Sequence, residues 1–207
     1  MRRFSMEHYH KFFNPHSIAI IGASGKTGPG SYNLMENLMK EDCTARLYPV
    51  NIRAREVLGH KAYASVMDLP ESADLAVITV PRTAAIPALR DCVRKGISSV
   101  VIITQGFADA DEKGRRMQED MLEIIRDSDT RVIGPNSIGV ANAFDNFHTS
   151  FQPFDLFRKE NAMICQSGMF ILASADFTNG LGLGVDIGNA ADVGFSDLLP
   201  CLARDSR

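Results

Sequence analysis

Three glycines at even spacing, with a cation and a hydroxyl between them, are the first group of residues whose types suit a defined chemistry. Residues 17–38 read SIAIIGASGKTGPGSYNLMENL, and Gly22, Gly25 and Gly28 frame Lys26 and Thr27. Glycine lets a backbone turn sharply and approach a ligand closely. A helix that begins directly after such a turn points its positive end at a bound anion. The pattern therefore predicts a phosphate-binding turn; the alternative is a tight turn without a ligand.

Two familiar phosphate sites can be tested against this turn. A triphosphate loop needs a glycine five residues before Gly25, where Ile20 stands. An NAD site needs an acid after the second strand, but that position reads Val-Asn-Ile-Arg and ends at Arg53. Arg53, with Arg55 nearby, would suit a phosphate on the ribose, at the 2′ position in NADP or the 3′ position in coenzyme A (CoA). The alternative is that both arginines are solvated loop charges.

A second turn of the same kind lies at residues 165–169, which read CQSGM. The Ser167 hydroxyl and the N–H groups of Gly168 and Met169 could bind an anion or cap a helix. A hydrolase nucleophile elbow needs glycine where Cys165 and Met169 stand, which argues against a serine nucleophile.

Strand-like and helix-like stretches alternate along the chain and must position these turns. Apolar runs typical of buried strands lie at 17–22, 46–51, 73–80, 98–104 and 130–134. Helical patterns lie at 30–40, 83–95 and 111–127. This order predicts an α/β protein whose parallel sheet carries helices on both faces.

The pattern changes after about residue 143. We expect a Rossmann-like domain over 1–142, an aromatic-rich linker over 143–159 and the start of a second, flavodoxin-like α/β domain over 160–207. Strands at 161–165 and 183–188 and helices at 167–180 and 195–205 make up that second part. Two such units form only a thin sheet with open edges, so this domain looks unfinished.

Composition excludes several classes of protein. The 207 residues carry a formal charge of −3, which gives no basis for binding nucleic acid or an anionic membrane, and no apolar run is long enough to span a bilayer. Arg2 and Arg3 are followed by polar residues, so we expect no signal peptide. The scattered cysteines form no disulfide or metal pattern, and we expect a reduced, cytoplasmic protein without a metal site. These cysteines are Cys43, Cys92, Cys165 and Cys201.

Taken together, the motifs resemble the α-subunit region of ADP-forming acyl-CoA synthetases, relatives of succinyl-CoA synthetase. The pieces that carry the resemblance follow one another from about residue 12 to the end of the chain. They are SIAIIGAS with Gly25 to Gly28, YPVN (48–51), DLAVITVP (74–81), VVIITQGF (100–107), GPNSIGV (134–140), QSG (166–168) and GNAADVGFSDLL (188–199).

The resemblance implies a CoA site and a phosphate site. CoA would be bound by the first glycine turn, the ends of strands two to four and the GPN turn, that is by Gly22, Ser24, Gly25, Lys26, Thr27, Gly28, Asn51, Arg53, Val80, Pro81, Thr104, Gln105 and Asn136. The phosphate site would comprise Ser167, Gly168, Met169, Gly188 and Asn189. Succinyl-specific relatives have an acid where Gln105 stands, which leaves CoA binding intact and argues against a dicarboxylate substrate.

The resemblance also implies a reaction that needs more than these residues. In the family, acyl-CoA and phosphate give acyl phosphate and CoA, and a histidine then carries the phosphoryl group to ADP. We expect that histidine beyond Arg207, because none of the five histidines here matches its motif. ATP, ADP and Mg²⁺ would bind to a partner ATP-grasp domain or subunit. Assembly of this chain into a homo-oligomer is a further possibility.

Two other functions remain open from the sequence. One is a regulatory module that senses CoA, such as the synthetase-like part of certain protein acetyltransferases. The other is an NADP-dependent oxidoreductase, although no Tyr-x-x-x-Lys or other hydride-transfer set is present.

Overall fold

The first half of the molecule is built on a five-stranded parallel sheet. The structure, a computed structural model, describes residues 4–207 without the side chains of residues 175 and 177, so Arg2 and Arg3 lie outside it. The strands are ordered β2 (Arg46–Val50), β1 (Ser17–Ile21), β5 (Leu75–Ile78), β6 (Ser99–Ile102) and β7 (Arg131–Ile133). All neighbours are parallel, as predicted. Counting these five strands alone, the order is 2-1-3-4-5, a doubly wound arrangement.

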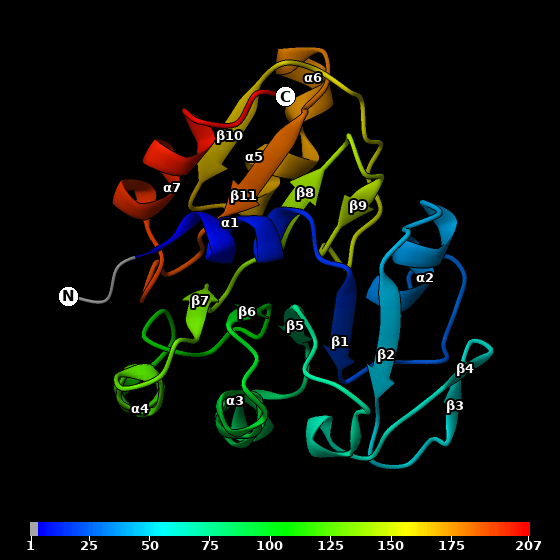
Figure 1. The fold of residues 1–207 in the computed structure, drawn as a ribbon, viewed down its shortest axis with the longest axis vertical. Coiled ribbons are helices and arrows are strands. Elements are labelled where there is room, and N and C mark those ends of the chain that lie inside the picture. Colours follow the sequence, from blue (N-terminus) through cyan, green and yellow to red (C-terminus); the bar gives the residue numbers. More distant parts are fainter. Residues whose placement is uncertain (1–3) are drawn as a thin grey trace.

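Both faces of this sheet are covered, which explains its uninterrupted apolar strands. In β1, Ile18 and Ile20 pack toward α1 (Met6–Phe13) and α2 (Leu34–Lys40). Their neighbours Ala19 and Ile21 pack on the opposite face, where α3 (Arg82–Lys95) and α4 (Glu112–Ile125) lie. Figure 1 shows α3 and α4 together below the sheet.

The N-terminal helix α1 lies between the two halves of the molecule (Figure 1). It contacts β6 of the first sheet and β8 (Gly139–Asn142) of a second sheet. The Ser5 side chain caps it, and the rings of Tyr9, Phe12 and Phe13 are fully buried in a core that both sheets share. No helix is predicted over these residues from the sequence pattern.

The second sheet has four strands rather than the two that were predicted. Its order is β10 (Ala162–Cys165), β11 (Leu183–Asp186), β8 (Gly139–Asn142) and β9 (Phe147–His148). The first two strands run parallel as expected, whereas β8 and β9 form an antiparallel hairpin on the far side of β11. This hairpin falls at the end of the predicted first domain and the start of the predicted linker.

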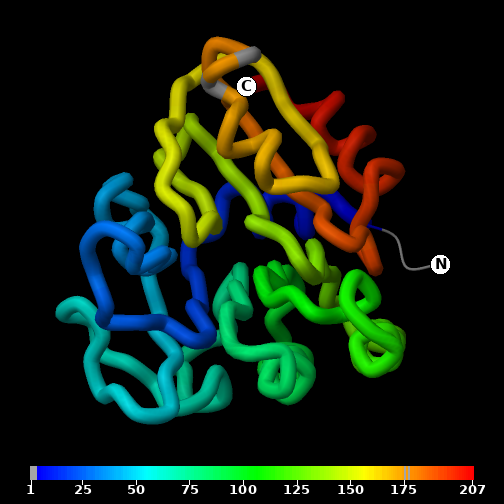
Figure 2. The backbone as a smooth tube through the Cα atoms, turned by 180° about the vertical axis from the view of Figure 1, so that it is seen from behind, coloured from blue at the N-terminus to red at the C-terminus, as the bar shows by residue number. Residues whose placement is uncertain are grey.

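Short helices complete the second half, which occupies the upper part of the backbone view in Figure 2. The predicted helix over 167–180 is divided into α5 (Gly168–Leu172) and α6 (Ser174–Thr178), and α7 (Phe195–Leu202) follows β11. Within the described residues, no helix is long and apolar enough to cross a membrane, and no cluster of metal-binding side chains occurs.

The connections of the first sheet hold three smaller elements. A hairpin of β3 (Glu56–Val57) and β4 (His60–Lys61) follows β2, and a 3₁₀ turn, η1 (Val66–Asp68), precedes β5. Helix α2 begins at Leu34 and not directly after Gly28, so the first glycine turn is part of a loop that covers residues 22–33.

Candidate functional site

The first glycine of the turn is required by the sheet itself. Gly22 ends β1 with a left-handed φ of 96°, and a Cβ there would lie 2.8 Å from Thr79 Oγ1. Thr79 follows β5 and donates its hydroxyl to the Ile21 carbonyl at 2.9 Å. Gly22 therefore lets the ends of β1 and β5 approach each other.

The next residues of the turn are more exposed and are organised by their own backbone. The Lys26 N–H donates to Ser24 Oγ at 3.2 Å, which bends the segment. Gly25, Lys26 and Thr27 are exposed. A Cβ on Gly25 would meet no atom within 4 Å, and its φ lies outside the left-handed region, so nothing in the described chain requires glycine there. The open space beside Gly25 suits close approach by an external group.

Two residues that the sequence analysis missed fix this loop to α2. Asn33 is buried and donates its side-chain amide to the carbonyls of Ser24, at 2.8 Å, and of Lys26, at 2.7 Å. Its Oδ1 also accepts the Met35 N–H at 3.0 Å, which makes Asn33 the N-cap of α2. An asparagine directly before an apolar helical run is a recognisable cap signal, but its bonds to the loop have no sequence signature.

Glu36, the second residue missed, affects one of the predicted ligand groups. Its carboxylate accepts the Gly28 N–H, with both oxygens 3.3 Å away, and the Ser31 hydroxyl at 2.9 Å. Hydrogen bonds from Lys40 and Ser31 lower the pKa of Glu36. The Gly28 N–H is thus already bonded to a side chain of the protein. A phosphate in this loop would therefore bind to the Ser24–Thr27 part of the turn.

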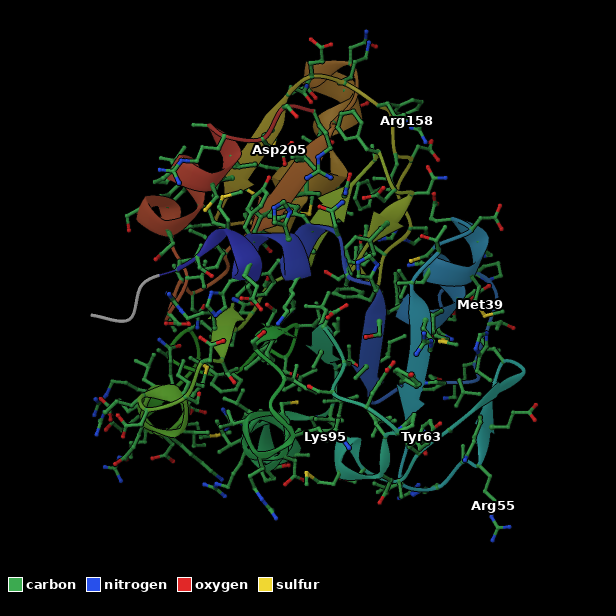
Figure 3. All side chains as sticks on the ribbon, in the orientation of Figure 1. Met39, Arg55, Tyr63, Lys95, Arg158 and Asp205 are labelled. Atoms are coloured by element: carbon green, nitrogen blue, oxygen red, sulfur yellow. The ribbon has the colours of Figure 1, made fainter. Side chains whose placement is uncertain are left out.

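The residues after β2 form a turn beside the loop. Asn51 donates to the Ala23 carbonyl at 2.9 Å, and its Oδ1 accepts the N–H groups of Arg53 and Ala54. Asn51 thus ties the end of β2 to the end of β1. The Arg53 side chain is exposed, and Arg55 extends away from the body of the molecule at the lower right of Figure 3.

A pocket of about 460 Å³ lies at the carboxyl ends of β1, β2 and β5. Because β1 and β5 are where the strand order reverses direction, this is the switch point at which open α/β sheets bind ligands. Five of the predicted CoA residues line it, namely Gly22, Asn51, Arg53, Val80 and Pro81. Ser65 and Asp91 add polar groups that the sequence analysis did not select.

Two smaller pockets are linked to this one by shared lining residues and include residues of the second half of the chain. The first, of about 180 Å³, shares Gly22 with the large pocket and includes Ser24, Thr79 and Phe151. The second, of about 220 Å³, includes Gln105, Asn136, Ser167, Gly168 and Met169. The chain thus brings Gln105 and Asn136, two residues of the predicted CoA site, together with the second turn in a pocket formed by both halves of the chain.

The remaining predicted residues at this end have clear structural contacts. Thr104 donates its hydroxyl to the Val80 carbonyl at 2.7 Å and so joins the ends of β5 and β6. Asn136 has a left-handed φ of 58°, and its N–H donates to the Thr104 carbonyl at 3.0 Å. Gln105 is exposed.

The second turn opens α5, which has only five residues. The Ser167 side chain makes no capping bond to this helix, and the Met169 side chain is 69% exposed. Gly168 packs against Ile138, because a Cβ there would lie 2.7 Å from that side chain. A helix this short offers an anion only a few free N–H groups.

Asp186, at the end of β11, also lines this pocket and was missed by the sequence analysis. It is 2% exposed, and its carboxylate accepts the N–H groups of Ile138, at 2.9 Å, and Gly188, at 3.0 Å. Burial raises the pKa of Asp186 above its ordinary value.

Gly188 and Asn189 join the two sheets. A Cβ on Gly188 would lie 2.3 Å from the Pro135 carbonyl oxygen, so the two loops pack backbone against backbone. The Asn189 amide donates to Asp109 at 2.9 Å and to Gln118 at 3.0 Å, both in the first half of the chain. In the described chain, the amide donors of Asn189 are thus used to hold the halves together.

A doubly wound sheet with a pocket at its switch point places the protein in the class of α/β nucleotide- and cofactor-binding domains. The model of the CoA binding domain family matches residues 16–143, and the chain belongs to this family. The family predicted from the motifs is thereby confirmed.

Relatives extend the match beyond that domain. The chain is 39% identical over 197 residues to the α subunit of acetate–CoA ligase (ADP-forming) II of Pyrococcus furiosus, covering 93% of this chain and 42% of the relative. It is 34% identical to 4-hydroxybutyrate–CoA ligase (ADP-forming) of Nitrosopumilus maritimus, covering 92% of this chain and 28% of the relative.

Among solved structures, acetyl-coenzyme A synthetase 1 of Ca. Korarchaeum cryptofilum, in complex with phosphate and ADP, is similar over 97% of this chain and 44% of its own. The TM-score is 0.88 and the identity 31%. The chain spans less than half the length of the relatives it matches.

Proposed function

We propose that this chain binds CoA or acyl-CoA in the groove formed by the three pockets, as part of an ADP-forming acyl-CoA synthetase. The observation that carries the proposal is that neighbouring pockets share lining residues, Gly22 between the first two and Ile103 and Phe151 between the last two. The groove begins at the switch point of the first sheet and ends between Gln105 and Ser167, where the two sheets meet. A long ligand with a nucleotide at one end and a reactive group at the other fits such a site.

The residues suit the parts of CoA in order. The nucleotide would occupy the 460 Å³ pocket, with Arg53 as the cation for the ribose 3′-phosphate. The diphosphate would lie against the exposed amides of Gly25, Lys26 and Thr27, with the Lys26 ammonium nearby. The pantetheine arm would continue past Ser24 and Thr79 to its thiol beside Gln105 and Asn136.

The chemistry would take place at the thiol end. Phosphate attacks the thioester carbonyl, the carbon–sulfur bond breaks, and CoA leaves as the thiol while the acyl group becomes acyl phosphate. The turn at Ser167 would bind the phosphate with its backbone N–H groups. Gln105 stands where the succinyl-specific relatives have an acid, and this difference argues against a dicarboxylate acyl group.

The later steps would need parts outside these residues. A histidine beyond Arg207 would accept the phosphoryl group and pass it to ADP, bound with Mg²⁺ on an ATP-grasp domain or subunit. We propose that the two halves of the chain correspond to a CoA-binding domain and the start of a ligase-like domain. The reaction would take place in the cytoplasm. A homo-oligomer is compatible with this arrangement.

Calorimetry with CoA, dephospho-CoA and NADPH tests the proposal. We expect CoA to bind more tightly than dephospho-CoA, because only CoA carries the 3′-phosphate that Arg53 would neutralise. Absence of CoA binding, or equal affinity for the two, would contradict the proposed ligand. Tighter binding of NADPH than of CoA would favour an oxidoreductase instead.

A further inference from the structure

One aromatic side chain lies between two of the pockets. The 180 Å³ and 220 Å³ pockets both include Ile103 and Phe151 among their lining residues. Ile103 follows β6 and is 8% exposed, whereas Phe151 is half-buried and belongs to the segment after β9. A ligand that runs from one pocket into the other must pass this pair, which we call the neck.

Helix α2 fixes the position of Phe151 in the neck. Asn37, which is 5% exposed, donates its side-chain amide to the carbonyls of Ser150 and Phe151, both at 3.1 Å. The Tyr32 ring, in the loop just before this helix, meets the Phe151 ring edge-on, with centroids 6.2 Å apart. The backbone that carries Phe151 is therefore fixed to α2 and not only to its own hairpin.

The same helix also fixes the phosphate loop. Asn33 lies one turn before Asn37 and binds the carbonyls of Ser24 and Lys26. Because these two asparagines are on one rigid helix, the loop and the neck keep a constant separation. That separation corresponds to the stretch between the diphosphate and the middle of the pantetheine arm in the proposed ligand.

We propose that Phe151 is a specificity-determining residue for the pantetheine arm, and that Asn37 is the residue that positions it. This inference rests on the proposed function. The arm is an uncharged chain with a branched dimethyl group and two amides, and its apolar part would pack against the Phe151 and Ile103 side chains. The neck thus selects ligands that carry the arm over nucleotides that lack it.

The test compares two ligands on the full-length protein as its gene encodes it. CoA has the arm, and adenosine 3′,5′-bisphosphate has the nucleotide end alone. We expect Phe151→Ala to weaken CoA binding about tenfold, as loss of a buried aromatic contact does, and to leave adenosine bisphosphate affinity unchanged. Phe151→Trp, which narrows the neck, should also weaken CoA alone.

Asn37→Ser tests the positioning residue, and Phe195→Ala is the matched control. The serine is too short to reach both carbonyls, so the CoA-specific loss should appear with Phe151 still present. Phe195 is an exposed ring on α7, and its removal should change neither affinity. Thermal unfolding of each variant shows whether it is folded.

The outcomes separate this inference from the proposed function. If wild-type protein binds CoA but Phe151→Ala and Phe151→Trp lower both affinities equally, or neither, the ring has no part in selecting the arm and the inference is overturned. If wild-type protein does not bind CoA at all, the proposed function itself fails, and the inference fails with it.

Discussion

Replacing Asn33 with serine should disorder the loop over residues 22–33 while leaving the stability of α2 unchanged. Serine is a good N-cap, so the bond to the Met35 N–H can persist. The bonds from Asn33 to the Ser24 and Lys26 carbonyls, at 2.8 and 2.7 Å, cannot.

The expected magnitude follows from these two bonds. Each contributes about 0.5–1.5 kcal/mol net, so their loss makes the loop about 2 kcal/mol easier to open. Because the loop is exposed, we expect it to open locally while the rest of the protein stays folded. A ligand that needs the closed loop must then order it again, so the affinity should fall by up to roughly 30-fold, the factor that corresponds to 2 kcal/mol.

Three measurements check this prediction. Calorimetry with CoA gives the affinity, amide hydrogen exchange at residues 24–28 gives the opening of the loop, and thermal unfolding gives the global stability. Asn33→Ala serves as a comparison, because it removes the cap as well and should also lower the unfolding temperature. If Asn33→Ser binds CoA as tightly as the wild type while exchange at 24–28 is faster, loop order does not control binding and the reasoning is refuted.

The remaining predictions concern the nucleotide end, the second sheet and pH. Arg53→Ala should weaken CoA but not dephospho-CoA in calorimetry; equal losses would rule out a 3′-phosphate contact. Gly139→Ala should lower stability in urea unfolding by more than about 2 kcal/mol, because its Cβ would lie 1.9 Å from Thr149 Oγ1. Burial lowers the pKa of His148 from 6.5 to about 4, so the unfolded state binds a proton first as the pH falls. Stability should therefore decrease from about pH 6.5 toward pH 4, by at most about 3 kcal/mol, and an equally steep decrease in His148→Phe would contradict this.

The first sheet could be predicted from the sequence because its strands are buried on both faces. A strand covered by helices on both sides must be apolar throughout, so runs such as 17–22 and 98–104 stand out from their surroundings. The β8–β9 hairpin could not be predicted in this way. Each of its strands has only two to four residues, and Phe147 and His148 are both buried, so no alternation of polar and apolar residues reveals them.

At the candidate site, many of the lining residues could be predicted from the sequence, whereas the contacts that hold them in place could not. Gly22, Val80 and Pro81 were found because strand ends and glycine turns are visible as patterns, and they line one pocket in the structure. Asn37 and Phe151 were not found. The contact between them joins residues more than a hundred positions apart, and such a contact depends on how the second half of the chain folds back onto α2.

The 220 Å³ pocket has residues from both halves of the chain, so its shape depends on how firmly the two sheets are joined. Arg131 in β7 is 3% exposed and binds Asp192 at 2.9 Å and Asp197 at 3.5 Å, both after β11. Removing one partner from such a buried pair is costly, because the remaining charge stays out of water.

These ion pairs act together with the Asn189 bonds to Asp109 and Gln118 and with α1, whose rings fill the core between the sheets. Rotation of one sheet against the other would have to break all three sets of contacts. The turn at Ser167 and the backbone at Gln105 are therefore held at a fixed separation before any ligand binds. The proposed reaction of a thioester with phosphate would gain from this rigidity, because the fold itself would position the two reacting groups.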